Sequence, residues 1–306
     1  MLFSRTEAFD PDQHIPDLSG KVILVTGGNN GLGKENVRQL AKHHPSKLYL
    51  GARNEARAQG AISEIKREIP DANIVFLEID LASFSSINKA ARRLLSENDR
   101  LDILVNNAGV FATPPGLSED GYEIQFGTNY MGTALLTRLL IPLLERTASL
   151  QGADVRVVSV SSALHMAAPN ERLLLSENKT TLESIGTMAR YGQSKLAMIY
   201  WTRSMANEHP AIKFVAVHPG VVRTGLEVPS WTAVLIKIVG RFFLSDVSTG
   251  ALNQLWASVA PSEKVRSGAM YYPVAKEFDG RTTAADDEMA GTLWKWTESE
   301  FNEKGF

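Results

Sequence analysis

The sequence predicts an α/β protein, a single Rossmann-type domain built on a doubly wound, mostly parallel sheet of about seven strands. Short, β-branched and nearly continuously apolar segments alternate with helix-length segments from about Lys21 onward. A glycine-rich loop follows the first apolar segment directly, which is typical of nucleotide-binding βαβ units. Neither an internal repeat nor a Pro/Gly/Ser-rich linker divides the 306 residues, so one domain is the simplest reading.

The apolar segments suit strands that helices cover on both faces, as in a parallel sheet. Helical spacing of apolar residues predicts helices at 55–69, at 85–96 and, longest, at 119–146. This order implies right-handed crossovers and a ligand site at the carboxyl ends of the strands. The expected strands are 21–26, 47–51, 73–79, 101–105, 155–160, 212–217 and 269–273.

Composition is that of an ordinary globular protein, with 44% apolar and 22% charged residues. The formal net charge of −2 offers no basic excess for a nucleic-acid partner. The chain has no cysteine, and its six histidines lack HExxH-like spacing, so we expect no disulfide and no metal site.

The chain start and the apolar runs give the expected organisation and location. Residues 1–20 lack the apolar core of a signal peptide, and no stretch is long enough for a transmembrane helix. We therefore expect a soluble, cytoplasmic protein. An N-terminal arm at 1–18 is expected to precede the Rossmann domain at 19–306, which ends in a C-terminal extension.

The glycine-rich loop runs from Thr26 to Gly33 with the sequence TGGNNGLG. Glycines at such a place permit a tight turn and let backbone N–H groups and a helix N-terminus approach a pyrophosphate. A loop of this kind can also be a simple turn. Its position between an expected strand and an expected helix favours the dinucleotide-binding interpretation.

Further motifs follow the loop in a fixed order. They are Asp80-Leu81, the NNAG of 106–109, Asn129, Ser161-Ser162, the YGQSK of 191–195 and Pro219-Gly220. Over residues 18–250 this series resembles the short-chain dehydrogenase/reductase family, in its single-domain branch with a TGxxxGxG loop and a YxxxK motif. The segments GNNGLGKE, FGTNYMG, VVSVSS and HPGVVRT look most similar to retinol-dehydrogenase-like proteins and fungal carbonyl reductases.

The resemblance implies a bound nicotinamide cofactor. In the family the glycine loop holds the pyrophosphate, the aspartate after the third strand contacts the adenine amine, and NNAG lines the adenine-ribose side. The few residues after the Pro-Gly turn lie against the nicotinamide amide. The implied cofactor-binding residues are Gly27, Asn29, Asn30, Gly31, Leu32, Gly33, Arg53, Asp80, Leu81, Asn107, Ala108, Gly109, Tyr191, Lys195, Pro219, Val222 and Thr224.

The resemblance also implies four catalytic residues, Asn129, Ser162, Tyr191 and Lys195. Tyr191 and Lys195 are four residues apart and share one face of a helix. A tyrosine that exchanges protons near neutrality needs a pKa about 3 units below its usual value, or about 4 kcal/mol. A lysine ~4 Å away at an effective dielectric of ~20 supplies about that much. We therefore expect Tyr191 as acid/base, Ser162 on the substrate oxygen and Asn129 on a proton-relaying water.

Two alternatives remain at the serine pair. Ser162 and Tyr191 are 29 residues apart, longer than in most of the family although similar to its retinol-like subgroup. Ser161 is therefore an alternative to Ser162, which we prefer from its alignment with the family's second serine. His165 suggests a Ser-His hydrolase, but no G-x-S-x-G motif surrounds the serine.

The end of the second expected strand predicts the cofactor type. NAD-specific Rossmann domains place an acid there to bind the ribose hydroxyls. In this chain Ala52 occupies that position and Arg53 follows it. A guanidinium can pair with a 2′-phosphate, which an aspartate would repel. We therefore expect NADP(H).

The expected function is NADP(H)-dependent interconversion of a carbonyl and an alcohol on a small lipophilic substrate. Segments 112–117, 163–190 and 228–244, which would form the pocket, offer many apolar side chains and lack charged clusters. A non-catalytic NADP(H)-binding regulator or scaffold is the alternative, less favoured because Tyr191 and Lys195 are both present. An isomerase or dehydratase on the same fold is a third possibility.

Two further expectations concern partners. Residues 225–245 match the family's substrate lid. Within them Trp231, Phe242 and Phe243 accompany Lys237 and Arg241, which also suits peripheral membrane contact through 228–244. The resemblance further implies a homodimer through the helix at 119–146 and the helix that begins near Tyr191, unless the inserted segment 163–190 blocks that contact.

Overall fold

The computed structural model describes residues 9–169, 172–220, 246–278 and 286–306. The strands form one seven-stranded sheet in the order β3-β2-β1-β4-β5-β6-β7, and all of its pairings are parallel. This confirms the predicted fold class. The strands are β1 (Val22–Thr26), β2 (Lys47–Ala52), β3 (Ile74–Glu78), β4 (Ile103–Asn106), β5 (Arg156–Val160), β6 (Lys213–Val217) and β7 (Met270–Tyr271).

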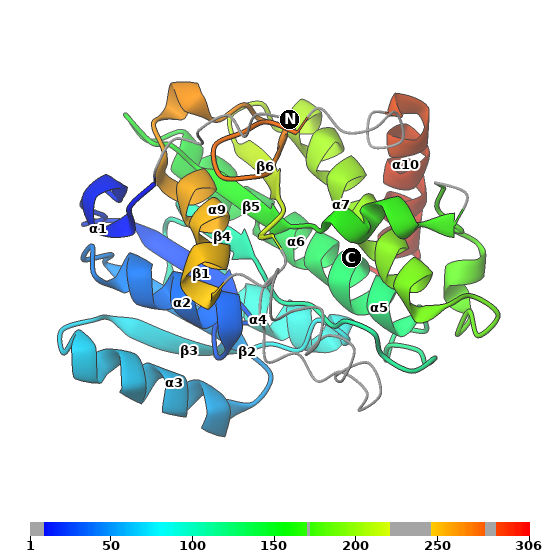
Figure 1. The fold of residues 1–306 in the computed structure, drawn as a ribbon, viewed down its shortest axis with the longest axis horizontal. Coiled ribbons are helices and arrows are strands. Elements are labelled where there is room, and N and C mark those ends of the chain that lie inside the picture. The colour runs from blue at the N-terminus through cyan, green and yellow to red at the C-terminus, as the bar shows by residue number, and fades with distance from the viewer. Residues whose placement is uncertain (1–8, 170–171, 221–245, 279–285) are drawn as a thin grey trace.

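Helices cover both faces of the sheet (Figure 1). α2, α3 and α9 pack on one face, and α4, α6 and α7 pack on the other. Strands covered on both sides are apolar throughout, so their ends can be located in the sequence. Each strand begins and ends within about two residues of the predicted range, and β7 lies within its predicted range. The helices are α1 (Pro11–His14), α2 (Gly31–Ala41), α3 (Glu55–Glu68), α4 (Phe84–Glu97), α5 (Ile124–Phe126), α6 (Gly132–Ala148), α7 (Thr187–Glu208), α9 (Val247–Val259) and α10 (Asp287–Glu303).

In the described part of the chain, four short helical turns join these elements. Three are 3₁₀ turns, η2 (Ala163–Ala167), η4 (Glu177–Lys179) and η5 (Ser262–Lys264). The fourth, η1 (Gly127–Met131), is a π-helical turn between α5 and α6. π-Helical turns occur frequently at functional sites.

The long helix predicted at 119–146 is wrong at its start. Gly121 has a φ of +87°, which ends any helical path, and Leu117 pairs with Glu123 in an isolated antiparallel bridge. The helical segment begins only at α5, where the Glu123 carboxylate accepts the N–H groups of Gln125 and Phe126. This cap satisfies backbone donors that otherwise have no partner at a helix start.

α10 belongs to what the sequence indicated only as a C-terminal extension, and it lies beside α7 (Figure 1). Its buried stripe includes Leu293, Thr297 and Phe301. Trp294 stacks on Trp201 of α7 with ring centroids 5.0 Å apart. α10 therefore covers part of the outer surface of the helix that carries Tyr191.

None of the helices in the described part of the chain combines the length and the apolarity that crossing a membrane requires.

Candidate active site

The structure brings Ser162, Tyr191 and Lys195 together where β5 ends. Ser162 follows β5, and the other two residues lie one turn apart on α7. The Ser162 side chain lies near Tyr191 and, as a hydrogen-bonding group, lowers the pKa of the tyrosine. The Lys195 Nζ atom lies 5.5 Å from the centroid of the Tyr191 ring and donates to the Val160 carbonyl oxygen at 2.7 Å. A polar triad thus lies at the carboxyl edge of the sheet, where parallel sheets bind ligands.

The two adjacent serines differ in orientation. The Ser161 hydroxyl is buried and donates to the Lys195 carbonyl oxygen at 2.9 Å. The Ser162 hydroxyl accepts the Leu164 N–H at 3.2 Å, so it caps η2 while facing Tyr191. Ser162 is therefore the serine that stands next to the tyrosine, and Ser161 fastens the strand end to α7.

Asn129 lies in the π turn η1 and is buried. Its side chain binds the backbone of Val110 twice, accepting the N–H at 2.7 Å and donating to the carbonyl oxygen at 3.0 Å. It also donates to the Ser194 hydroxyl on α7 at 3.0 Å. A β-carbon added at Gly109 would lie 3.0 Å from the Asn129 Oδ1 and 3.7 Å from the Lys195 Nζ. The end of NNAG, the asparagine and the lysine thus converge on one point.

The pKa of the tyrosine departs from expectation in direction. Burial raises the pKa of Tyr191 to about 12, and the hydrogen bond with Ser162 opposes that rise. Burial also lowers the pKa of Lys195 to about 8, so its ammonium is still charged at neutral pH. The ammonium lies over the ring and donates to Val160. At neutral pH the tyrosine hydroxyl is therefore protonated, the form that donates a proton.

Gly192 is a residue that the sequence reasoning missed. A β-carbon there would lie 2.6 Å from the Leu164 carbonyl oxygen and 2.7 Å from the Ala168 N atom. Only glycine lets the η2 segment lie this close to α7, and that segment begins directly after Ser162. A glycine inside a helix destabilises it relative to alanine, so its presence at 192 was the signal that close packing requires it there.

The glycine loop is packed as a nucleotide cradle would be. A β-carbon at Gly33 would lie 2.3 Å from the Gly27 carbonyl oxygen, and one at Gly27 would lie 2.9 Å from the Ala108 α-carbon. The Asn107 Nδ2 atom donates to the Thr26 carbonyl oxygen at 2.9 Å. NNAG thus holds the loop against the end of β1 and leaves its backbone N–H groups beside the start of α2.

The remaining residues of the expected cofactor site lie in different surroundings. Asp80 uses its carboxylate to accept the Ala82 N–H at 2.9 Å, and the Leu81 side chain is buried in the core. Only the backbone of Leu81 can therefore meet a ligand. Pro219 follows β6. Val222, Thr224 and the segment 225–245 lie outside the described residues.

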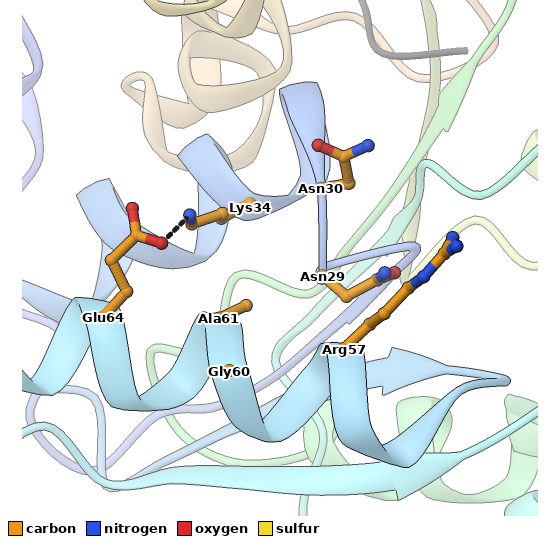
Figure 2. A pocket seen from close by; sticks show the side chains of 7 residues that line it. All are labelled: Asn29, Asn30, Lys34, Arg57, Gly60, Ala61 and Glu64. Atoms are coloured by element: carbon orange, nitrogen blue, oxygen red, sulfur yellow. Dashed lines mark ion pairs between the residues drawn. The ribbon is translucent and has the colours of Figure 1, made fainter. Parts of the chain in front are cut away.

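A pocket of about 330 Å³ adjoins the glycine loop between α2 and α3. Figure 2 shows the Arg57 side chain extending toward Asn29, with Lys34 paired to Glu64 at 2.5 Å. Arg53, the cation that the sequence indicated, is exposed and does not line this pocket. The reasoning missed Arg57 and Lys34 because their convergence depends on how two helices pack. The lining residues are Asn29, Asn30, Lys34, Arg57, Gly60, Ala61 and Glu64.

His165 does not form a hydrolytic pair with the serine. Its Nδ1 atom lies 2.7 Å from the Ser162 carbonyl oxygen, an acceptor, so this nitrogen carries the proton. Burial lowers the pKa of His165. The imidazole therefore fixes the backbone of Ser162 rather than activating its hydroxyl.

Known proteins resemble this chain over nearly its full length. The family model described as short chain dehydrogenase matches residues 21–171. A short-chain dehydrogenase/reductase named drtF from Aspergillus calidoustus is 39% identical, covering 95% of this chain and 96% of its own. Retinol dehydrogenase 14 of Mus musculus is 33% identical over 92% of this chain and 86% of its own.

The fold has relatives among solved structures as well. The crystal structure of an uncharacterized protein from Mycobacterium paratuberculosis is 25% identical, with a TM-score of 0.73. The likeness covers 96% of this chain and 97% of that one.

Proposed function

The chain belongs to the short chain dehydrogenase family, and from this premise we propose that it is an NADP(H)-dependent oxidoreductase that interconverts a carbonyl and an alcohol on a small lipophilic substrate. The dehydrogenase/reductase class follows from the family. The observation that carries the finer proposal is the convergence of Ser162, Tyr191 and Lys195 at the end of β5.

Each of these side chains has a separate task in the proposed reaction. The Ser162 hydroxyl holds the substrate oxygen beside the Tyr191 hydroxyl, which donates a proton to that oxygen during reduction. A pKa of about 12 keeps Tyr191 protonated at neutral pH, the form that donates to the substrate oxygen in the reduction. Lys195 holds the cofactor ribose and steadies the charge that forms on the tyrosine. Asn129 fixes the backbone of Val110. Through Ser194 it also fixes the turn of α7 between Tyr191 and Lys195.

The residues present fit a dinucleotide. The contacts of Gly27 and Gly33 leave a backbone cradle that β-carbons would fill, and the start of α2 adds its N–H groups. When bound, the cofactor supplies or accepts the hydride.

A preference for the phosphorylated cofactor is supported by charge. Ala52 ends β2 without a carboxylate, Arg53 is exposed next to it, and the adjoining pocket contains Arg57 and Lys34. A 2′-phosphate at this place would meet two or three cations against the single carboxylate of Glu64. We assign Arg57 to the phosphate beside the expected Arg53.

The lipophilic substrate is supported by the surroundings of the triad. Leu164 and Met166 follow Ser162, and Met188 lies one turn before Tyr191 on α7; all three are exposed apolar side chains. Exposed apolar groups beside a polar triad suit a substrate that buries them on binding.

Association with partners remains a prediction. Membrane contact through 228–244 concerns a segment outside the described residues. A homodimer through α6 and α7 would have to include α10, because Trp294 of α10 already covers Trp201. Light scattering at micromolar concentration tests it: a dimer mass supports the prediction, and a monomer mass contradicts it.

The proposed function is tested by NADPH oxidation with a panel of ketones and aldehydes. Tyr191→Phe preserves the ring but removes the acid, so turnover should fall by about 10²–10⁴-fold while NADPH affinity changes little. Full turnover by this variant would contradict the proposed mechanism. If the unmodified chain and Tyr191→Phe both bind NADPH but neither oxidises it in the presence of any ketone or aldehyde tested, the protein is a non-catalytic binder.

A further inference from the structure

Phe111 is an aromatic residue that packs against the tyrosine of the triad. Its ring centroid lies 4.8 Å from that of Tyr191, with the planes at 83°. The ring is partly exposed and belongs to none of the apolar clusters that form the core. Core packing therefore does not explain its position.

The backbone on both sides of Phe111 is fixed. Val110 is bound twice by Asn129. Ala112 has a φ of +54°, a conformation that a residue with a β-carbon adopts at a cost, and its N–H donates to the Gln125 Oε1 at 3.0 Å. The left-handed turn at Ala112 is held by a buried partner.

A second set of contacts, made by Arg190, holds the same segment against α7. Arg190 directly precedes Tyr191, and its guanidinium is 2% exposed. It donates to the Thr113 carbonyl oxygen at 2.9 Å, to the Glu123 Oε1 at 2.7 Å and to the Ile185 carbonyl oxygen at 3.3 Å. The turn of α7 that presents Tyr191 thus also holds the backbone after Phe111. The two rings are kept at a fixed spacing.

We propose that Phe111 is the specificity-determining wall of the substrate site beside Tyr191, limiting the size of the group next to the reacting carbonyl, and that Arg190 is its positioning residue. This inference rests on the proposed function. A substrate oxygen must come within about 3 Å of the tyrosine hydroxyl. A carbonyl held there has one substituent near an aromatic ring that its anchored backbone keeps in place.

The test uses aryl alkyl ketones whose alkyl group grows from methyl to ethyl to propyl, with kcat/KM measured for each ketone with NADPH. Phe111→Ala should raise the ratio of propyl to methyl ketone by about tenfold or more, because one methylene in a tight apolar pocket changes kcat/KM by at least about that factor. Phe111→Leu should shift the ratio less. Leu150→Ala, a change at an exposed apolar residue just after the end of α6 and outside the expected pocket segments, should leave it unchanged.

The positioning role has its own readout. Arg190→Met should also raise the propyl-to-methyl ratio, and Arg190→Lys should restore part of the original preference. Binding of the same ketones to the NADPH complex of Tyr191→Phe, with and without Phe111→Ala, should show the same shift without turnover.

The outcomes separate the two proposals. Tyr191-dependent turnover with an unchanged ratio in Phe111→Ala would overturn this inference and leave the proposed function standing. A ratio that Phe111→Ala shifts and Arg190→Met does not would overturn the positioning role alone. Absence of Tyr191-dependent turnover with every ketone and aldehyde tested would overturn the proposed function and this inference with it.

Discussion

Gly192 lies against the backbone of Leu164 so closely that a β-carbon at the glycine would be 2.6 Å from the leucine carbonyl oxygen. The contact joins two parts of the site, because Gly192 is next to Tyr191 and η2 begins directly after Ser162. The position of the serine beside the tyrosine depends on this approach.

Gly192→Ala should therefore separate Ser162 from Tyr191. We expect turnover to fall by about 10²-fold, the effect of a displacement of about 1 Å at a reacting group. The free energy of unfolding should fall by about 1–3 kcal/mol because the added methyl overpacks a backbone contact. Gly291→Ala on α10, where a β-carbon meets nothing within 4 Å, is the control and should not reduce turnover. Equal turnover of Gly192→Ala and the unmodified chain would contradict this account.

Lys195 gives an expected pH dependence. Its pKa is lowered to about 8 by burial, so the side chain is charged below pH 8 and neutral above it. If the ammonium holds the cofactor ribose, NADPH should bind more tightly below pH 8 and more weakly as the pH rises through that value. Fluorescence titration between pH 7 and 9.5 measures this change. Lys195→Met should bind NADPH weakly, and its affinity should not change near pH 8. A variant whose affinity still falls as the pH rises through 8 would rule out the lysine as the cause.

Arg57 should discriminate between the cofactors. Arg57→Ala should raise the KM for NADPH by about tenfold or more and leave that for NADH unchanged, because a hydrogen bond to a charged group contributes about 1.5–3 kcal/mol. Arg67→Ala, near the other end of α3 and also exposed, is the matched control. Parallel changes for both cofactors would contradict a 2′-phosphate contact.

The end of β2 should contribute to the same preference. Ala52→Asp with Arg53→Ala adds a carboxylate that repels the 2′-phosphate and binds ribose hydroxyls, so the double variant should shift toward NADH. The ratio of kcat/KM values for the two cofactors measures the shift. Equal use of NADPH and NADH by the unmodified chain would contradict the proposed preference.

The buried ion pair between Arg190 and Glu123 should dominate local stability. Both side chains are almost fully buried, with the nitrogen and oxygen 2.7 Å apart. Arg190→Met leaves a buried carboxylate without its cation and should cost about 3–5 kcal/mol of unfolding free energy. Adding Glu123→Gln should recover part of this loss, since the amide carries no charge. Chemical denaturation of the single and double variants measures the coupling, and strictly additive losses would show that the pair does not interact.

The sheet could be predicted from the sequence because buried parallel strands are apolar on both faces. The motif residues could be placed at the strand ends for the same reason. The contacts that hold the site could not be predicted. Glu123 meets Arg190, and Arg57 comes to line the same pocket as Asn29, only after helices pack, and no local pattern links such distant residues. The helix start at 119 was wrong because helical spacing outweighed the turn signal of Gly121.

α10 has a consequence for the order in which the molecule is completed. The Tyr130 hydroxyl, next in the chain to Asn129, is 2.6 Å from the Thr297 hydroxyl, a partner 167 residues further along. At a synthesis rate of ~5–20 residues per second, roughly 10–30 s pass between the appearance of the two residues. During that interval β1 to β4 can already pair, while the π turn lacks its outer support. The outer support of the π turn that carries Asn129 is therefore among the last parts of the molecule to be synthesised.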